Sequence, residues 1–243
     1  MNTGQKNNSG DGRGKYHQER SLSDMFSHQI RNPLTAITGY VSLLREGTFG
    51  SLSNEQDEIL QVISKNVRRV NMLLDDYKDL EHIEANDLSL SKCLVPVPEV
   101  LEQIVQELSS VASEKGVTLN LEIEQGIKFF VDVDAIKRVF LHIIFNSINY
   151  TQSGVVNVKA YNDGKWNVVV VKDTGIGIYD EDRANIFKKY YRSSNPYVRE
   201  NPGAGVGLYI ARAHVISHGG SIEIEGAPGK GTVATVKLPV IPN

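Results

Sequence analysis

Apolar residues recur at steps of three or four along the first third of the chain, the spacing of one face of an α-helix. The first run consists of Leu22, Phe26, Ile30, Leu34, Ile37, Val41 and Leu44. The second run consists of Ile59, Ile63, Val70, Leu73, Tyr77 and Leu80. Between the runs, Gly47 and Gly50 interrupt the pattern, and Ser53 with Gln56 forms a capping-box signature. The pattern predicts an antiparallel helical hairpin over residues 17–84, after a disordered, Asn-, Gly- and Lys-rich segment over residues 1–16.

A single hairpin of this kind cannot bury its own apolar stripe. Two copies that pack their stripes together form a four-helix bundle, so we expect a homodimer. The alternative is burial of the stripe against the rest of the same chain, and the homodimer is the preferred interpretation.

From about Leu88 the pattern becomes that of a mixed α/β domain, which we place at residues 85–243. The predicted helices are Val100–Val111, Ala135–Tyr150, Asp180–Phe187 and Gly207–His218. The predicted strands are Val117–Ile123, Phe129–Val131, Val155–Tyr161, Trp166–Lys172, Ser221–Glu225 and Thr232–Leu238. Asn162–Gly164 and Gly229–Gly231 are turn signals that indicate two β-hairpins. The predicted fold class is α plus α/β, with an α/β sandwich whose mixed sheet carries helices on one face.

Composition excludes several classes of protein. The net charge of −3 leaves no broad basic face, so we expect no nucleic-acid partner. No apolar run is long enough to span a bilayer, and the start of the chain lacks a signal-peptide pattern. The single cysteine, Cys93, cannot form an internal disulfide, which fits a reducing, cytoplasmic location.

Three short segments carry residue types suited to a nucleotide. Asn146 lies late on a predicted helix, and its side-chain oxygen is a ligand that suits Mg²⁺. Asp173–Ile178 follows a strand; its carboxylate can accept a hydrogen bond from an amine such as that of adenine, and its glycines let the backbone approach a ring. Gly203–Leu208 precedes a helix, where glycines and free N–H groups bind phosphate. Each segment also has an ordinary interpretation: a solvated asparagine, a tight turn, and a glycine-rich loop of neither Walker nor Rossmann type.

In this order, the segments closely resemble the catalytic ATP-binding domain of histidine kinases, a member of the superfamily of gyrase B, Hsp90 and MutL. The resemblance covers about Leu88 to Leu238. Its motifs are the N-box region Asp132–Thr151, the first glycine box Asp173–Ile178, the F-box Ile186–Arg192, the second glycine box Gly203–Leu208, and the closing segments His218–Gly220 and Gly229–Thr232. The resemblance implies that the domain binds ATP with Mg²⁺.

The resemblance also implies a role for each matching residue. Asn146 would bind Mg²⁺, and Asp173 would recognise adenine. Arg192 is a candidate to contact the terminal phosphate, the alternative being a solvated cation at the edge of the lid. Ser193–Pro202 would form the mobile lid over the nucleotide. The other residues implied in ATP binding are Asn149, Tyr150, Gly175, Gly177, Ile178, Gly203, Gly205, Val206, Gly207, Leu208 and Thr232.

Ser27–Leu34 strongly resembles the H-box of histidine kinases, and the helical spacing agrees with an exposed acceptor. His28 lies about 200° around the helix from Phe26 and from Ile30, so it faces solvent, where another domain can reach it. The resemblance implies that Mg-ATP phosphorylates His28 and that the group then passes to an aspartate of a response regulator receiver domain. Asn32, one helical turn later, would orient water for dephosphorylation of that regulator.

Three positions depart from the family pattern. Gln29 stands where the family usually has Glu or Asp after the histidine, and a neutral side chain stabilises imidazolium less. His142 replaces the first N-box asparagine, and Asn149 replaces the usual lysine, so one cation on the phosphates is absent. Loss of such a group typically costs about 10²-fold or more, which favours slow autophosphorylation. Candidates to compensate are Lys137, Lys188 and Lys189.

Three functional hypotheses follow, in order of preference. The first is an active histidine kinase, with or without phosphatase activity toward its regulator. The second is a degenerate kinase that uses ATP binding and dimerisation as a conformational switch, motivated by the three departures. The third is an ATPase of the gyrase–Hsp90 type, which is disfavoured because those enzymes place a glutamate where this chain has His142.

Overall fold

The computed structural model describes the backbone of residues 11–201 and 203–240, and side chains from residue 25 on, apart from residue 26. Residues 1–16 were expected to be disordered. Residues 1–10 of this segment lie outside the described part of the chain, and from Asp11 on the chain is helical. Contacts divide the chain into two compact units, and the division falls between Ala85 and Asn86. In the part of the chain so described, no helix combines the length and the apolar character that a membrane crossing needs.

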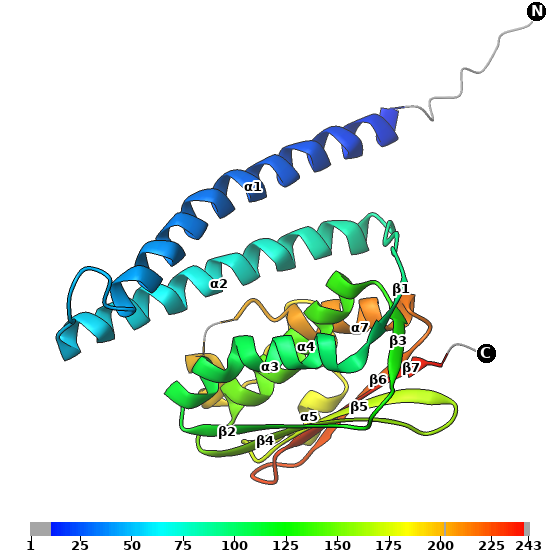
Figure 1. Cartoon of the computed structure of the whole chain (residues 1–243). Coiled ribbons are helices and arrows are strands. Elements are labelled where there is room, and N and C mark those ends of the chain that lie inside the picture. The colour runs from blue at the N-terminus through cyan, green and yellow to red at the C-terminus, as the bar shows by residue number, and fades with distance from the viewer. Residues whose placement is uncertain (1–10, 202, 241–243) are drawn as a thin grey trace, which may run out of the picture. The chain divides into compact units, whose positions relative to one another are not determined.

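The first unit is a helical hairpin, as predicted (Figure 1). Helix α1 spans Asp11–Arg45, and helix α2 spans Asn54–Glu84. Gly47 and Gly50 lie in the turn with φ values of +76° and +114°, which glycine adopts without steric strain. The Ser53 hydroxyl accepts the N–H of Gln56 at 3.2 Å, and the Gln56 side chain accepts the N–H of Ser53 at 2.8 Å. The predicted capping box is therefore confirmed.

Ion pairs contribute little to the pairing of the two helices. Arg31 and Asp75 are 2.6 Å apart, and Arg45 and Asp57 are 2.8 Å apart. Both pairs are solvent-exposed, and such pairs contribute about 0–1 kcal/mol each. The hairpin therefore depends on its apolar contacts.

Much of the apolar stripe remains exposed on the hairpin. Among the described side chains of the hairpin, the buried apolar ones are Val41, Leu60, Val67 and Leu80. In contrast, Ile30 and Ile37 are each 40% exposed, and Ile59 is 60% exposed. This agrees with the expectation that one hairpin cannot bury its own stripe.

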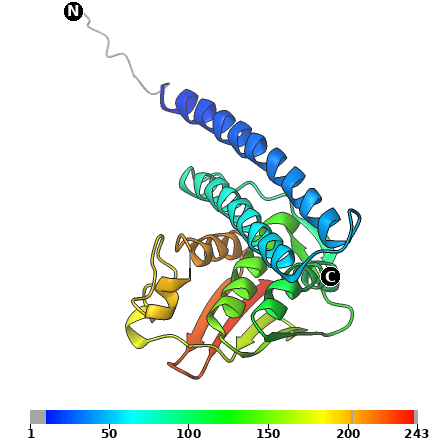
Figure 2. The ribbon, with the colours of Figure 1, turned by 90° about the vertical axis from the view of Figure 1, so that its left-hand side faces the viewer.

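The second unit is an α/β sandwich, as predicted. Its five-stranded sheet has the order β2-β4-β5-β7-β6, in which β2 and β4 are parallel and the other neighbours are antiparallel. These strands span Val117–Ile123 (β2), Gly154–Asn162 (β4), Trp166–Asp173 (β5), Ser221–Gly226 (β6) and Thr232–Pro239 (β7). Three helices cover one face of the sheet (Figures 1 and 2). They are Val97–Glu114 (α3), Val133–Tyr150 (α4) and Gly207–Ser217 (α7).

The core lies between the sheet and these helices. The buried face of α4 includes Ile136, Phe140, Ile144 and Ile148, which recur every four residues. Phe140 stacks on Phe129 with ring centroids 6.2 Å apart. Each buried side chain of this size contributes about 1.5–3 kcal/mol. This packing fixes α4 on the sheet, and with it the backbone that carries Asn146.

The helix predicted at Asp180–Phe187 is shorter than expected and ends at Arg183 (α5). The cause is the buried carboxylate of Asp182, which accepts hydrogen bonds from Tyr191 and Ser193 at 2.6 Å each. These bonds fold the following residues back toward α5, so the predicted helix cannot continue in a straight line.

Two short elements were not predicted. Strand β1 spans Cys93–Pro96 and helix α6 spans Pro196–Glu200. Elements of four or five residues show no measurable periodicity, and they form through tertiary partners. Strand β3, Lys128–Val131, was predicted, but it pairs antiparallel with β1 and stays outside the main sheet.

A buried histidine joins the end of α7 to the start of α4. The Nδ1–H of His218 donates to the carbonyl of His214 at 2.7 Å, and its Nε2 accepts the N–H of Asp132 at 3.0 Å. Asp132 caps α4 by accepting the N–H of Ala135 at 3.1 Å. Burial lowers the pKa of His218, the nearby Lys92 and His214 lower this pKa further, and the His214 carbonyl and Asp132 oppose the change. The ring must be neutral to make both hydrogen bonds, because Nε2 can accept the N–H of Asp132 only when it carries no proton.

Acidification is expected to destabilise the second unit through His218. The unfolded chain takes up this proton near the ordinary pKa of 6.5, while the folded chain has a lower pKa. The stabilisation is complete above pH 6.5 and is lost as the pH falls from there through the folded pKa, with a slope of at most about 1.4 kcal/mol per pH unit. His218→Gln can make both hydrogen bonds without titrating. Its melting temperature should fall less than that of the wild type between about pH 7.5 and 5.5; equal falls would contradict the assignment.

Candidate functional site

The segments singled out in the second unit meet around the C-terminal half of α4. The carbonyl of Tyr150 accepts the N–H of Ile176 at 3.0 Å, which ties the end of α4 to the first glycine box. About two turns before Tyr150 on the same helix, the ring of His142 lies against Gly207 at the start of α7. Helix α4 therefore contacts both glycine boxes, which are far apart in the sequence.

Asp173, a residue that is only 3% exposed, ends strand β5. Its Oδ1 accepts the N–H of Gly175 at 2.9 Å and the N–H of Thr232 at 3.0 Å, and Ser147 of α4 also bonds to the carboxylate. Burial raises the pKa of this carboxyl, and the three hydrogen bonds oppose that rise. A carboxylate fixed in this way has a defined orientation, which suits the recognition of an exocyclic amine.

The glycines of the first glycine box are required by the chain's own backbone. A Cβ at Gly175 would lie 2.4 Å from the carbonyl oxygen of Tyr150. At Gly177, where φ is +72°, a Cβ would lie 1.9 Å from the carbonyl oxygen of Ala227. The sequence interpretation assigned these glycines to the approach of a ring, and the close packing of the main chain is an additional reason for them. Ile178, the last residue of this box, is half-buried.

The last turns of α4 carry the polar side chains predicted to contact the nucleotide. Asn146, Asn149 and Tyr150 are half-buried there. Burial raises the pKa of the Tyr150 phenol, and the charge of Arg192 opposes that rise, so the two side chains are neighbours.

The residues of α4 fit a magnesium ion bound together with a nucleotide. Within residues 11–201 and 203–240, no three His, Cys, Asp or Glu side chains are grouped as a metal site. Mg²⁺ usually keeps several waters and binds through one or two protein ligands plus phosphates. The half-buried amide of Asn146 can supply one such ligand.

The start of α7 offers backbone donors. Its N-cap residue, Val206, is buried, and no side chain caps the helix there. The first N–H groups of a helix have no partners within the helix, so such a terminus suits a phosphate. Before the helix, Gly203 is exposed, and in its first turn Leu208 is half-buried.

The other two glycines of the second glycine box lie against other segments of the chain. A Cβ at Gly205, where φ is +71°, would lie 2.6 Å from the carbonyl oxygen of Tyr191 in the F-box. A Cβ at Gly207 would lie 2.7 Å from Nδ1 of His142. The loop is therefore held between the F-box and α4, and a side chain at either glycine would displace it.

The lid predicted at Ser193–Pro202 is described up to Asn201 and contains helix α6. The guanidinium of Arg192 donates to the carbonyls of Val198 and Asn201, at the end of that helix. The residues on both sides of Arg192 donate to Asp182. Arg192 thus belongs to the hydrogen-bond network of the lid, and its contact with a terminal phosphate stays a prediction.

Lys115 is a residue of this region that the sequence analysis missed. Its ammonium donates to the carbonyls of Ile148 and Asn149 at 3.2 and 2.5 Å, at the end of α4. Lys115 lies between α3 and β2 and in no motif. The only signal in the sequence is that α4 has no basic residue of its own in its last turn.

In the first unit, the predicted acceptor side chain is accessible. His28, Gln29 and Asn32 are all exposed on α1. The prediction that His28 faces solvent is confirmed.

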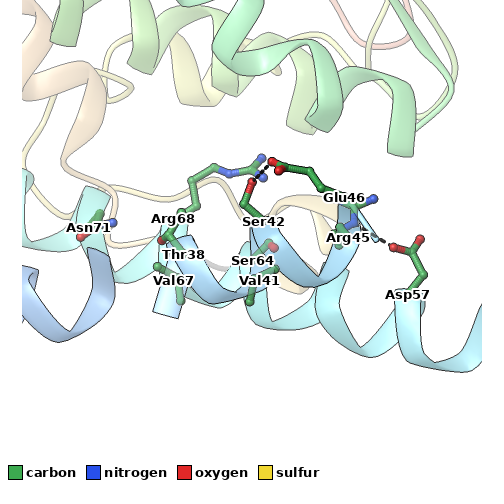
Figure 3. A pocket seen from close by; sticks show the side chains of 10 residues that line it. All are labelled: Thr38, Val41, Ser42, Arg45, Glu46, Asp57, Ser64, Val67, Arg68 and Asn71. Atoms are coloured by element: carbon green, nitrogen blue, oxygen red, sulfur yellow. Dashed lines mark hydrogen bonds and ion pairs between the residues drawn. The ribbon is translucent and has the colours of Figure 1, made fainter. Parts of the chain in front are cut away.

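A groove of about 480 Å³ lies between α1 and α2 (Figure 3). It is lined by Thr38, Val41, Ser42, Arg45, Glu46, Asp57, Ser64, Val67, Arg68 and Asn71. Two of these, Val41 and Val67, are buried, while the Arg45–Asp57 pair and the Ser42 to Glu46 hydrogen bond of 2.8 Å give it a polar rim. The groove begins about three turns after His28 along α1.

Two family models match the chain. One, described as the His Kinase A (phospho-acceptor) domain, matches residues 18–86. The other, described as the Histidine kinase-, DNA gyrase B-, and HSP90-like ATPase, matches residues 131–242. Together they cover most of the described residues of both units.

Curated relatives and solved structures agree with these matches. Sensor histidine kinase YclK of Bacillus subtilis is 32% identical over 88% of this chain and 45% of its own length. Histidine protein kinase DivJ of Caulobacter vibrioides is 32% identical over 91% of this chain and 37% of its own length. The chain thus spans less than half of either relative. Full-length ShkA in complex with AMPPNP is 25% identical with a TM-score of 0.64, over 90% of this chain and 46% of that chain. Histidine kinase AdeS of Acinetobacter baumannii, 20% identical over 87% of this chain and 97% of that chain with a TM-score of 0.59, shares the fold.

Proposed function

Because the chain carries both domains of the histidine kinase core and belongs to the histidine kinases, we propose that it phosphorylates its own His28 from Mg-ATP and passes the phosphoryl group to an aspartate of a response regulator. The observation that carries the proposal is an exposed H-box histidine in the same chain as the buried Asp173 and the start of α7, which no side chain caps. The proposed setting is the cytoplasm, which supplies ATP. The test is incorporation of acid-labile phosphate from γ-labelled ATP.

The proposed reaction has two transfers. An unprotonated ring nitrogen of His28 attacks the γ-phosphorus, so that an N–P bond forms while the bond to the ADP oxygen breaks. The proton on the other ring nitrogen can be held by the amide oxygen of Gln29 and then passes to water. In the second transfer the N–P bond breaks, and a carboxylate oxygen of the regulator bonds to phosphorus.

The second unit would hold ATP in place for the first transfer. Asp173 is proposed to accept a hydrogen bond from the adenine amine, and the N–H groups at the start of α7 to bind phosphate oxygens. Mg²⁺, held in part by Asn146, would neutralise charge on the phosphates. Arg192 would have to exchange its bonds to Val198 and Asn201 in order to reach a phosphate.

We propose that the functional unit is a homodimer. The exposed part of the stripe includes Ile30, Ile37, Ile59, Ile63, Leu73 and Tyr77. A second hairpin can cover these side chains in a four-helix bundle, and their burial stabilises such a bundle by about 25 cal/mol per Å².

The groove of the hairpin is the proposed docking place for the receiver domain (Figure 3). It lies on the same helix as His28, and its polar rim with a buried apolar floor suits a transient partner. Asn32, exposed one turn after His28, is proposed to orient water when the regulator is dephosphorylated.

Replacing Gln29 by Glu is expected to accelerate the labelling of His28 by about tenfold or more, because a carboxylate stabilises the imidazolium better than an amide. The measurement is the initial rate of acid-labile labelling with saturating ATP. Gln29→Leu, which removes the hydrogen bond without adding charge, is the matched control and should label no faster than the wild type. An unchanged rate for Gln29→Glu would show that the glutamine does not limit the reaction.

The second candidate function is a degenerate kinase that binds ATP as a dimeric switch. The observations that favour it are Gln29 beside the acceptor and the buried His142, whose ring lies against Gly207. This candidate predicts that calorimetry detects ATP binding while no label reaches His28 with regulator present. Labelling of His28 would exclude it.

A further inference from the structure

Lys115 connects three segments of the second unit. It follows α3 directly, and its ammonium donates to the carbonyls of Ile148 and Asn149 in the last turn of α4. The same ammonium is 3.3 Å from the hydroxyl of Tyr197 and 5.7 Å from the centre of its ring. Tyr197 lies in helix α6, within the lid.

The contact with α4 has a simple electrostatic reason. The last carbonyls of a helix have no donors within the helix, and the C-terminus carries partial negative charge, so a cation there is stabilising. Helix α4 has no basic residue in its own last turn, and Lys115 supplies the cation from outside. Lys92 does the same for α7, with its ammonium 3.4 Å from the carbonyl of Ser217. Capping alone is therefore a structural role.

The contact with Tyr197 gives Lys115 a second role that Lys92 lacks. Tyr197 is fixed within α6, because its N–H donates to the side chain of Asn195 at 2.9 Å and its carbonyl accepts from Asn201 at 2.8 Å. A bond to the Tyr197 hydroxyl therefore restrains the whole of α6. Both Lys115 and Tyr197 are half-buried, which limits screening of this contact by solvent.

We propose that Lys115 is a positioning residue for the retention of nucleotide: it holds lid helix α6 against the end of α4, next to Asn146 and Tyr150. The inference rests on the proposed binding of ATP to the second unit. A lid tied at this point opens less often, and bound nucleotide leaves only when the lid opens. Lys115 also places a cation close to Asn149, which replaces the lysine of the family pattern. The Lys115 ammonium, however, contacts the backbone of α4 and the lid.

The test is the dissociation rate of a fluorescent trinitrophenyl-ATP with Mg²⁺ from the full chain, measured by displacement with excess ATP. Lys115→Met keeps most of the side-chain stem and removes the ammonium, and it should speed release by about fivefold to tenfold, as expected for lost hydrogen bonds from a charged donor. Tyr197→Phe removes the hydroxyl that Lys115 contacts and keeps the ring, so it should speed release by up to the same factor. The double variant should be no faster than the faster single variant, and Lys115→Arg should restore part of the retention.

Lys92→Met is the matched control. It removes a lysine that caps a helix without touching the lid, so it should lower the melting temperature as Lys115→Met does and leave release within about twofold of the wild type. Release at the wild-type rate from both Lys115→Met and Tyr197→Phe would overturn the inference, and so would factors that multiply in the double variant. A wild-type chain that does not bind the probe would instead contradict the proposed function.

Discussion

His28→Ala is expected to abolish the incorporation of acid-labile phosphate from γ-labelled ATP, a loss of at least about 10³-fold. The substitution removes the only group that the proposed chemistry uses as nucleophile, and it does so at an exposed position of α1. Folding should be unaffected, because alanine is the best helix former and no packing is lost. The measurement is labelling followed by acid treatment, with the affinity for ATP measured on the same sample.

The matched control for this prediction is His82→Ala, which removes a histidine from α2 of the same hairpin. It should label like the wild type. Labelling of His28→Ala at the wild-type rate would show that the phosphate goes elsewhere. Loss of both labelling and ATP affinity in His28→Ala would mean that the substitution disturbs the second unit.

Gly177→Ala is expected to destabilise the second unit by about 3 kcal/mol or more and to weaken ATP binding by at least about tenfold. The new Cβ would lie 1.9 Å from the carbonyl oxygen of Ala227, at a φ of +72° that alanine rarely adopts. Main chain cannot rotate away as a side chain can, so the turn between β6 and β7 must move. That turn leads to Thr232, whose N–H orients Asp173. Thermal unfolding and calorimetry with ATP measure the two effects.

Gly126→Ala separates the steric contact from the backbone strain. Gly126 also has a positive φ, +80°, but a Cβ there has open space around it. This variant should lose only about 1–2 kcal/mol from the left-handed conformation, and it should bind ATP like the wild type. If the two variants lost equal amounts of stability, the requirement for glycine at position 177 would be due to its positive φ alone.

The sequence was sufficient for those parts of the fold that have a period or a turn signal. The apolar residues of α4 and the turn signal between β4 and β5 predicted these elements to within a few residues. Strand β1 and helix α6 were missed because they are too short to show a period. The predicted extension of α5 was wrong because Asp182 bonds to residues about ten positions later, and no local pattern indicates such a bond.

The candidate site was predicted to a different degree. Asp173 and the glycines stand in recognisable motifs, but the sequence explained only in part why glycine is required at these positions. Gly175 and Gly177 avoid contacts with the carbonyls of Tyr150 and Ala227, which depend on how distant segments fold together. Lys115 could not be found at all, because the carbonyls that it binds and the lid residue that it contacts are distant in sequence.

The hydrogen bonds of Asp173 limit how this part of the second unit can change during evolution. Its Oδ1 accepts the N–H groups of Gly175 and Thr232, and the same carboxylate is proposed to accept a hydrogen bond from the adenine amine. A substitution that altered base preference at this position would also leave two backbone donors without their acceptor, at about 1–3 kcal/mol for each one that stays buried. Sequences derived from this chain are therefore expected to vary more at the exposed side chains of the hairpin groove and of the lid than at Asp173, which selection for a folded domain keeps.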